Sequence, residues 1–178
     1  STVDDHSYVH QAFRGSGGKL ICVGTDESVT IEDYEDGISD KTAGIVFFYG
    51  SQTKDELAEV VDIGKKYSIP IVVDCAAQIP PKSNLTDLVA MGVDLVVYSG
   101  GKGIGGPQCT GLILGKKDLI NACKLNSNPN SALGRSMKVG KEEIVGLVTA
   151  VEELMFNDEE LVLKEWISWC DLIVSGAH

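Results

Sequence analysis

Lys102 stands between glycines, a context that suits amine chemistry. The stretch VYSGGKGIGGPQCTG, residues 97–111, places this lysine directly after an apolar run that reads as a buried strand. Glycines on both sides let a flat molecule approach the backbone closely. A lysine amine taken out of water is a nucleophile and can form a Schiff base with a carbonyl compound. The alternative is that Lys102 is an ordinary lysine in a flexible glycine turn.

Asp74 is a second candidate, because it ends the apolar run IVVD. An acid at the carboxyl end of a parallel strand points into the crevice where α/β folds bind ligands. A Schiff-base lysine and a carboxylate are the pair that pyridoxal 5'-phosphate (PLP) needs, since the carboxylate keeps the pyridine nitrogen protonated and the ring then accepts electrons. Ala76 and Ala77 are small and suit a flat ring lying against them. Taken alone, Asp74 is equally well explained as a turn residue or a helix cap.

The glycines around Lys102 also match a nucleotide-binding pattern literally. The segment GKGIGG fits GxGxxG, but Pro107 follows at once and CTGLILG reads as a strand. A dinucleotide site needs a helix N-terminus at this place to hold the pyrophosphate. The phosphate-binding pattern GxxxxGK[ST] fails too, because Val96 and Gly103 occupy its first and last positions. We therefore reject both nucleotide-binding readings.

Short apolar runs alternate with longer helical patterns along the chain. Continuous apolar runs such as IVVD and LVVY are typical of strands in a parallel sheet with helices on its faces. Asn84 or Ser83 is expected to cap the second helix. These patterns predict an α/β fold with three α/β/α layers and a mainly parallel sheet. The expected strands are 19–23, 44–49, 69–74, 93–99 and 110–114, and the expected helices are 53–67, 84–91, 116–125 and 141–154, with a further helical stretch near the end.

Composition narrows the function classes. The 178 residues carry a net charge of -11, which disfavours nucleic acid and anionic membranes as partners. No apolar run approaches the roughly 20 residues that span a bilayer. Five cysteines without CxxC spacing indicate reduced thiols in a cytoplasmic protein. Three histidines form no metal-ligand spacing with them, so we expect no metal site.

Three segments carry a family resemblance: VVDCAAQIPP, MGVDLVVYSGGKGIGGPQCTGLILGKKDLI and GRSMKVGKEEIVGLVTAVEEL. They resemble the selenocysteine-synthase-like branch of fold-type-I PLP enzymes, and within it look closest to D-glucosaminate-6-phosphate ammonia-lyase-like proteins. The resemblance runs from about residue 6 to residue 153. It implies that Lys102 holds PLP as a Schiff base and that Asp74 pairs with the pyridine nitrogen. It also implies that Ser99 contacts the phosphate or positions the lysine.

Three further residues follow from the same resemblance or its neighbourhood. Gln78 in the AAQ turn is expected to approach the cofactor or the substrate, or else to be a polar turn residue. Arg135 and Lys138 are expected to clamp a substrate carboxylate or phosphate, which suits the two-pronged guanidinium of arginine. Their alternative is a solvated basic turn. The family pattern has proline where this chain has Ser136, which leaves the exact substrate open.

The resemblance implies PLP-dependent α,β-elimination that releases ammonia from an amino-sugar acid or an amino acid, a small anionic substrate. Lys102, once displaced by the substrate amine, would serve as the base for the α-proton. The alternatives are transfer onto a seryl substrate, as in selenocysteine synthesis, and a non-catalytic domain that keeps the fold. We expect a homo-oligomer.

The resemblance also predicts an incomplete enzyme. Residues 1–152 would form part of the PLP-binding large domain, and residues 153–178 would begin a truncated carboxyl-terminal small domain. Family members are longer and have an upstream turn that cradles the phosphate. We therefore expect the chain by itself to bind PLP weakly and to be inactive.

Overall fold

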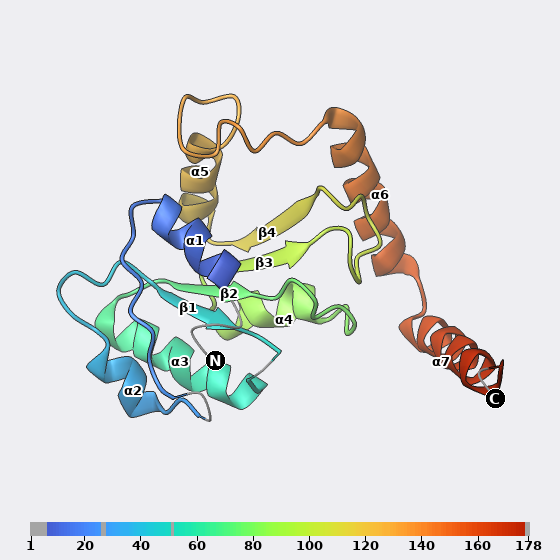
Figure 1. Cartoon of the computed structure of the whole chain (residues 1–178), viewed down its shortest axis with the longest axis horizontal. Coiled ribbons are helices and arrows are strands. Elements are labelled where there is room, and N and C mark those ends of the chain that lie inside the picture. The colour runs from blue at the N-terminus through green and yellow to red at the C-terminus, as the bar shows by residue number, and fades with distance from the viewer. Residues whose placement is uncertain (1–6, 26–27, 51, 177–178) are drawn as a thin grey trace.

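A four-stranded mixed sheet forms the centre of the protein (Figure 1). The computed structural model describes residues 7–25, 28–50 and 52–176. The strands lie in the order β1-β2-β3-β4. β1 (Ile45–Phe48), β2 (Ile71–Asp74) and β3 (Leu95–Ser99) are parallel, and β4 (Gly111–Gly115) runs antiparallel to β3. The predicted mixed α/β class and mainly parallel sheet are confirmed.

Two helices connect the parallel strands, as the sequence predicts. α3 (Lys54–Tyr67) joins β1 to β2, and α4 (Asn84–Met91) joins β2 to β3. α3 begins at a capping box, in which the Thr53 side chain accepts a hydrogen bond from the Glu56 backbone N–H and the Glu56 carboxylate accepts one from Thr53 N–H. The apolar sides of both helices cover one face of the sheet. The core beneath them holds Phe47, Leu57, Val60, Val61, Ile71, Val73, Leu88, Val96 and Tyr98.

β4 departs from the parallel arrangement because its connection is short. Residues 100–110 join β3 to β4 without a helix. A parallel strand needs a crossover of about a dozen or more residues, usually helical, whereas an antiparallel strand can be reached by a loop. The loop that makes β4 antiparallel is the loop that carries Lys102.

The predicted first strand, 19–23, is wrong. The segment has no regular secondary structure and belongs to none of the four strands, and Ile21 is 57% exposed. Apolar β-branched residues favour a strand only where a neighbouring strand supplies hydrogen bonds and side-chain contacts. This segment instead connects α1 (Ser7–Gly15) to α2 (Ile31–Asp36).

The three layers are only partly present in the described residues. α1 and α5 (Lys117–Asn126) lie on the side of the sheet opposite to α3 in Figure 1. The strand residues that face this side remain partly exposed, in contrast to the buried face under α3 and α4. The second face is therefore covered less completely than the first, in keeping with the expected incomplete large domain.

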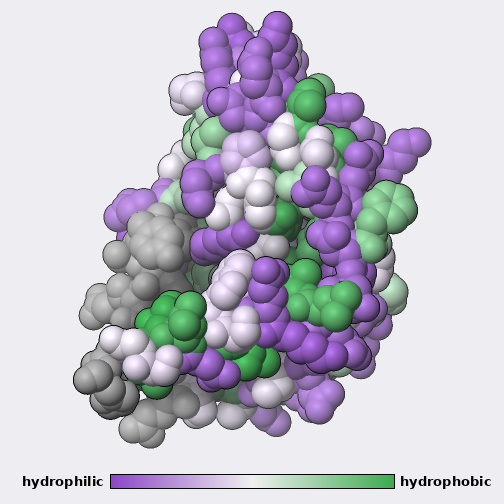
Figure 2. Space-filling model, turned by 90° about the vertical axis from the view of Figure 1, so that its right-hand side faces the viewer, coloured by the Kyte–Doolittle hydropathy of each residue, from purple (hydrophilic) through white to green (hydrophobic). Residues whose placement is uncertain are grey.

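Two helices follow, and the last of them projects from the body of the protein (Figure 1). α6 (Lys141–Phe156) passes beside the loop of Lys102, and α7 (Glu159–Gly176) has no buried residue. Figure 2 shows hydrophobic side chains among hydrophilic ones on the face that carries these helices. The break between them lies at residues 157–158, while the predicted domain division at 152 stays a prediction. Within the described part of the chain, no helix is long and apolar enough to cross a bilayer.

Candidate active site

The carboxyl ends of β2 and β3 bring three of the predicted residues to one edge of the sheet. Asp74 at the end of β2 is in register with Val97 of β3. The N–H of Ser99 donates to the Ala76 carbonyl oxygen at 3.4 Å. Asp74, Ala76 and Ser99 are all partly exposed there. Neighbouring parallel strands thus present an acid, a small residue and a hydroxyl at the place where such sheets bind ligands.

The Asp74 carboxylate is oriented by the backbone that follows it. Its Oδ1 accepts a hydrogen bond of 3.0 Å from the Ala76 N–H. Its carbonyl oxygen accepts one of 3.0 Å from the Tyr49 N–H. Both bonds fix the residue at the strand end, so the acid is held in place before any ligand arrives.

The loop of Lys102 is closed by its own hydrogen bonds. The N–H of Gly100 donates to Thr110 at 2.9 Å, and the N–H of Gly106 donates to Gly100 at 2.7 Å. The Gln108 side chain donates to the Gly101 carbonyl oxygen at 2.8 Å. Lys102 itself is exposed on this framework. Its backbone is therefore anchored, which argues against the alternative of a flexible glycine turn.

Gly103 brings this loop against the turn that follows Asp74. A Cβ on Gly103 would overlap the carbonyl oxygen and carbon of Ile79. Only glycine allows so close an approach of two backbone segments. The lysine loop and the Asp74 turn consequently touch each other.

Gln78 is held on both sides within that turn. Its carbonyl oxygen accepts a hydrogen bond of 2.7 Å from the Asn84 side chain. Its side-chain amide lies where a Cβ on Gly50 would be, and Gly50 has a φ of +130° that favours glycine. This contact supports the turn, while the predicted approach of Gln78 to a cofactor or substrate stays a prediction.

The layer beneath the site is neutral near pH 7. Cys75 is fully buried, and burial raises its thiol pKa to about 12. Burial also raises the pKa of Tyr98, whose hydroxyl donates to the Asn84 carbonyl oxygen at 2.7 Å. Neither group places a competing charge under the Asp74 carboxylate.

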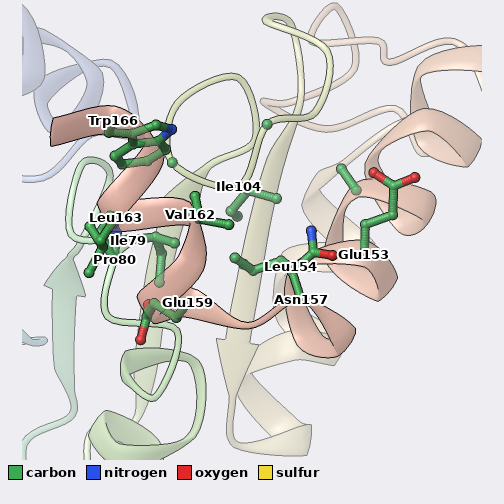
Figure 3. Close-up of a pocket in the computed structure, with 13 residues that line it drawn as sticks. Ile79, Pro80, Ile104, Glu153, Leu154, Asn157, Glu159, Val162, Leu163 and Trp166 are labelled. Carbon is green, nitrogen blue, oxygen red and sulfur yellow. The ribbon is translucent and has the colours of Figure 1, made fainter. Parts of the chain in front are cut away.

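A cavity of about 230 Å³ lies against residues 103–105 of the loop (Figure 3). Its walls come from the turn at Ile79 and Pro80, from residues 103–105, and from α6 and α7. Its lining does not include Asp74, Ser99 or Lys102. The cavity therefore borders the candidate site without being the place where those three side chains would meet a ligand.

Comparison with known proteins places the chain in a family. The family model described as L-seryl-tRNA selenium transferase (SelA) matches residues 8–168. This chain belongs to the SelA family. D-glucosaminate-6-phosphate ammonia lyase of Salmonella typhimurium is 34% identical, with 84% of this chain and 40% of that protein covered. L-seryl-tRNA(Sec) selenium transferase of Alkaliphilus oremlandii is 31% identical over 84% of this chain and 34% of its own length.

The chain is also similar to a relative with a third named activity and to a solved structure. A 5'-C-glycyluridine monooxygenase-decarboxylase of a Streptomyces species is 35% identical, over 81% of this chain and 35% of that protein. The structure of a D-glucosaminate-6-phosphate ammonia-lyase superposes with a TM-score of 0.72 at 32% identity, covering 84% of this chain and 40% of that one. The chain thus spans 40% or less of these relatives.

PLP is the cofactor of the SelA family and of its ammonia-lyase relatives. The residues present fit it chemically. A carboxylate is anchored through Oδ1, an exposed amine lies in the loop that follows the next strand, and a small residue and a hydroxyl stand between them in the sequence. Asp74, Lys102, Ser99 and Ala76 would hold the cofactor, which would supply an electron sink for a carbanion at the substrate.

The expectation that nucleic acid is excluded as a partner was too broad. Several SelA-family relatives are named for seryl-tRNA. The net charge of -11 is spread over the whole chain and does not describe the charge at one surface. Charge alone therefore cannot separate the activities of this family.

The predicted substrate residues lie on a separate exposed segment. Arg135 and Lys138 are both exposed between α5 and α6. The Arg135 carbonyl oxygen accepts a hydrogen bond of 3.5 Å from Asn128, and the N–H of Gly134 donates to Asn126 at 2.8 Å. These contacts tie the segment to itself and not to the sheet edge, so the clamp stays a prediction.

Sequence reasoning missed the residues that join the site together. Asn84 does not cap α4 with its side chain, and Ser83, the N-cap, makes no side-chain cap hydrogen bond. Lys82 was missed entirely: its Nζ donates to the carbonyl oxygens of Met155 (3.2 Å) and Asn157 (2.7 Å), and its N–H donates to Glu159 (2.6 Å). An amide next to a helix start is a weak local signal, and the contacts of Lys82 leave no signal in the sequence.

Proposed function

We propose that the protein is a PLP-dependent lyase that eliminates ammonia from an amino-sugar acid or an amino acid by α,β-elimination. One observation carries the proposal: Gly103 seats the Lys102 loop on the turn that follows Asp74. The loop that carries the amine is thereby in contact with the turn that follows the carboxylate. The proposal concerns the whole natural polypeptide that contains this chain.

Each residue has a stated task in the proposed reaction. Bound PLP supplies the electron sink that stabilises negative charge at the substrate α-carbon. Asp74 holds the proton on the ring nitrogen, and Ser99 donates to the phosphate or orients the lysine. The Lys102 amine would hold the cofactor and, when free, would take the α-proton of the substrate. Loss of the β-hydroxyl as water and hydrolysis of the carbon–nitrogen bond would give ammonia and a keto acid.

The substrate is proposed to be small and anionic. Arg135 and Lys138 would bind its carboxylate or phosphate, since both are exposed cations. Elimination is preferred to transfer on a seryl-tRNA because the solved structure that superposes with a TM-score of 0.72 is that of an ammonia-lyase. The seryl transferase remains the second candidate, since 31% identity to such an enzyme is close to the 34% for the lyase.

We further propose a cytoplasmic homo-oligomer. All five cysteines are unpaired, in keeping with a reducing compartment. Trp169 and Ile173 on α7 are 52% and 70% exposed, and apolar surface of this kind favours association. Light scattering on the natural polypeptide should therefore give a mass above that of a monomer, and a monomer at all concentrations would contradict this part.

The central test is chemical trapping on the natural polypeptide. PLP should produce an absorption band near about 420 nm, and borohydride reduction should fix the label on the peptide that contains Lys102. Lys116 and Lys117 are also exposed lysines, a short distance after Lys102 in the sequence, and they serve as internal controls. A label on either of them would remove the proposal.

The partner experiment replaces Asp74 with Asn. An amide oxygen can still accept from the Ala76 N–H, so the turn is kept while the charge is lost. Ammonia release should fall by about two powers of ten or more, which is roughly 3 kcal/mol in the barrier. Turnover within about threefold of wild type would show that Asp74 is only a turn residue.

A further inference from the structure

The side-chain amide of Asn84 supports the turn between β2 and α4. Asn84 is 4% exposed, at the first position of α4. Its Nδ2 donates to the Gln78 carbonyl oxygen at 2.7 Å. Its own carbonyl oxygen accepts the Tyr98 hydroxyl at 2.7 Å, and Tyr98 is 1% exposed. Asn84 therefore contacts the turn that follows Asp74 and the strand that leads to Lys102.

The geometry makes this link stiff. A buried donor or acceptor that loses its partner is penalised strongly, so the three groups hold one another in place. Tyr98 precedes Ser99 on β3, whose backbone also bonds to Ala76 at 3.4 Å. These hydrogen bonds therefore fix the turn relative to β3.

The turn that contains Gln78 and Ile79 supports the loop of Lys102. Ile79 directly follows Gln78, and its carbonyl oxygen is the atom that a Cβ on Gly103 would overlap. A displacement of Gln78 therefore moves the surface on which Gly103 rests. Lys102 directly precedes Gly103 in that loop, so a shift of the turn is passed on to Lys102.

We propose that Asn84 is a positioning residue, which holds turn 75–79 so that Asp74 and Lys102 keep a fixed spacing for the cofactor. It acts through the turn and touches neither the cofactor nor the substrate. The part of this inference that concerns the cofactor rests on the function proposed above. The part that concerns the order of the turn does not.

The test uses the natural polypeptide and the substitution Asn84→Asp. A carboxylate has nearly the shape of the amide and suits the first turn of a helix, so α4 should form. It cannot donate to Gln78, however, and it repels that carbonyl oxygen. The matched control is Asn121→Asp, the same chemical change at an exposed site on α5.

Hydrogen exchange of residues 75–79 and 101–106 is measured first, without cofactor. Asn84→Asp should speed exchange in both segments by about tenfold or more, and Asn121→Asp should leave both at wild-type rates. Unchanged exchange in either segment would overturn the inference. This readout decides the matter even if wild-type protein fails to bind PLP, a result that would defeat only the proposed function.

Cofactor binding is measured second. Asn84→Asp should weaken PLP binding by about tenfold and shift the pH midpoint of the visible band, because the spacing of Asp74 and Lys102 sets both. A purely structural role would lower the melting temperature without moving that midpoint in the folded protein. If Asn84→Asp does not fold, Asn84→Ser replaces it, since serine suits a helix start but is too short to reach Gln78. Wild-type affinity and midpoint in the folded variant would overturn the proposal.

Discussion

Gly103→Ala adds a single methyl group at the contact between the Lys102 loop and the Asp74 turn. The added Cβ would overlap the carbonyl oxygen and carbon of Ile79, which are backbone atoms and cannot rotate away. Real Cβ atoms essentially never come within 3.0 Å of such atoms. The loop must therefore retreat from the turn by about 1 Å or more, and Lys102 moves with it.

The size of the effect follows from that movement. Overpacking of a close contact costs about 1–3 kcal/mol of folding stability. A misplacement of about 1 Å at a reacting group lowers a rate by about two powers of ten. We therefore expect a folded variant with a melting temperature lower by several degrees and with turnover lower by about 100-fold.

The assay compares two alanine variants of the natural polypeptide. Gly111 lies in β4, paired with Ser99, and its Cβ would meet its nearest atom, the Tyr98 carbonyl oxygen, at an ordinary 3.4 Å. Gly111→Ala should therefore keep near wild-type melting and PLP absorption, whereas Gly103→Ala should lose most of the band near about 420 nm. If both variants bound PLP equally well, the loop–turn contact would not set the position of Lys102, and the reasoning from Gly103 would be refuted.

Three further outcomes are expected. Lys82→Met removes two Nζ hydrogen bonds, so it should speed hydrogen exchange in residues 155–159 and lower the free energy of unfolding by about 1–2 kcal/mol. The control Lys141→Met changes a side chain that is 90% exposed and should have neither effect. Cys75 should resist alkylation at about pH 8 until the protein unfolds, because it is fully buried and burial raises its pKa to about 12, and exposed Cys109 should react at once. The Thr53 backbone N–H donates to Glu56 and lowers the pKa of that carboxyl below its ordinary value of 4.5. The capping box therefore stabilises the protein above that ordinary value, and this stability is lost as the pH falls through the lower pKa of the folded state. Glu56→Gln, but not the exposed Glu59→Gln, should make the melting temperature depend less on pH between about pH 5 and about pH 3.

Most helices and strands could be predicted because each has its own signal in the local sequence, such as hydrophobic periodicity or a capping residue. The run 84–91 has helical periodicity and ends at Gly92, which adopts a left-handed φ of +112° as the C-cap. The run 19–23 has the same apolar character as the true strands yet stays unpaired. Pairing depends on a neighbour that the segment itself does not specify, so a strand pattern is necessary but not sufficient.

The site was predictable only in its outline. Asp74 ends β2 and Lys102 lies in the loop that follows β3, and the order of the strands alone places the ends of β2 and β3 along one edge. Their mutual support could not be predicted, because it depends on where the turn at Ile79 meets Gly103 and on which carbonyl the Asn84 amide reaches. Such contacts are set by tertiary packing and leave no periodic signal in the chain.

The difference between sequence motifs and tertiary contacts also explains why the cofactor can be assigned with less ambiguity than the reaction. Relatives with three different named activities are 31–35% identical to this chain. PLP chemistry uses a Schiff-base lysine and a partner for the pyridine nitrogen, whatever the substrate is. The reaction must then be chosen by groups that contact the substrate and direct the carbanion. In this chain we propose Arg135 and Lys138 for that role, and these exposed cations lie outside the hydrogen-bonded framework of the turn and the loop. Substitutions at the framework should therefore affect PLP binding for any substrate, whereas substitutions at Arg135 should alter KM for one substrate class and leave the cofactor spectrum unchanged.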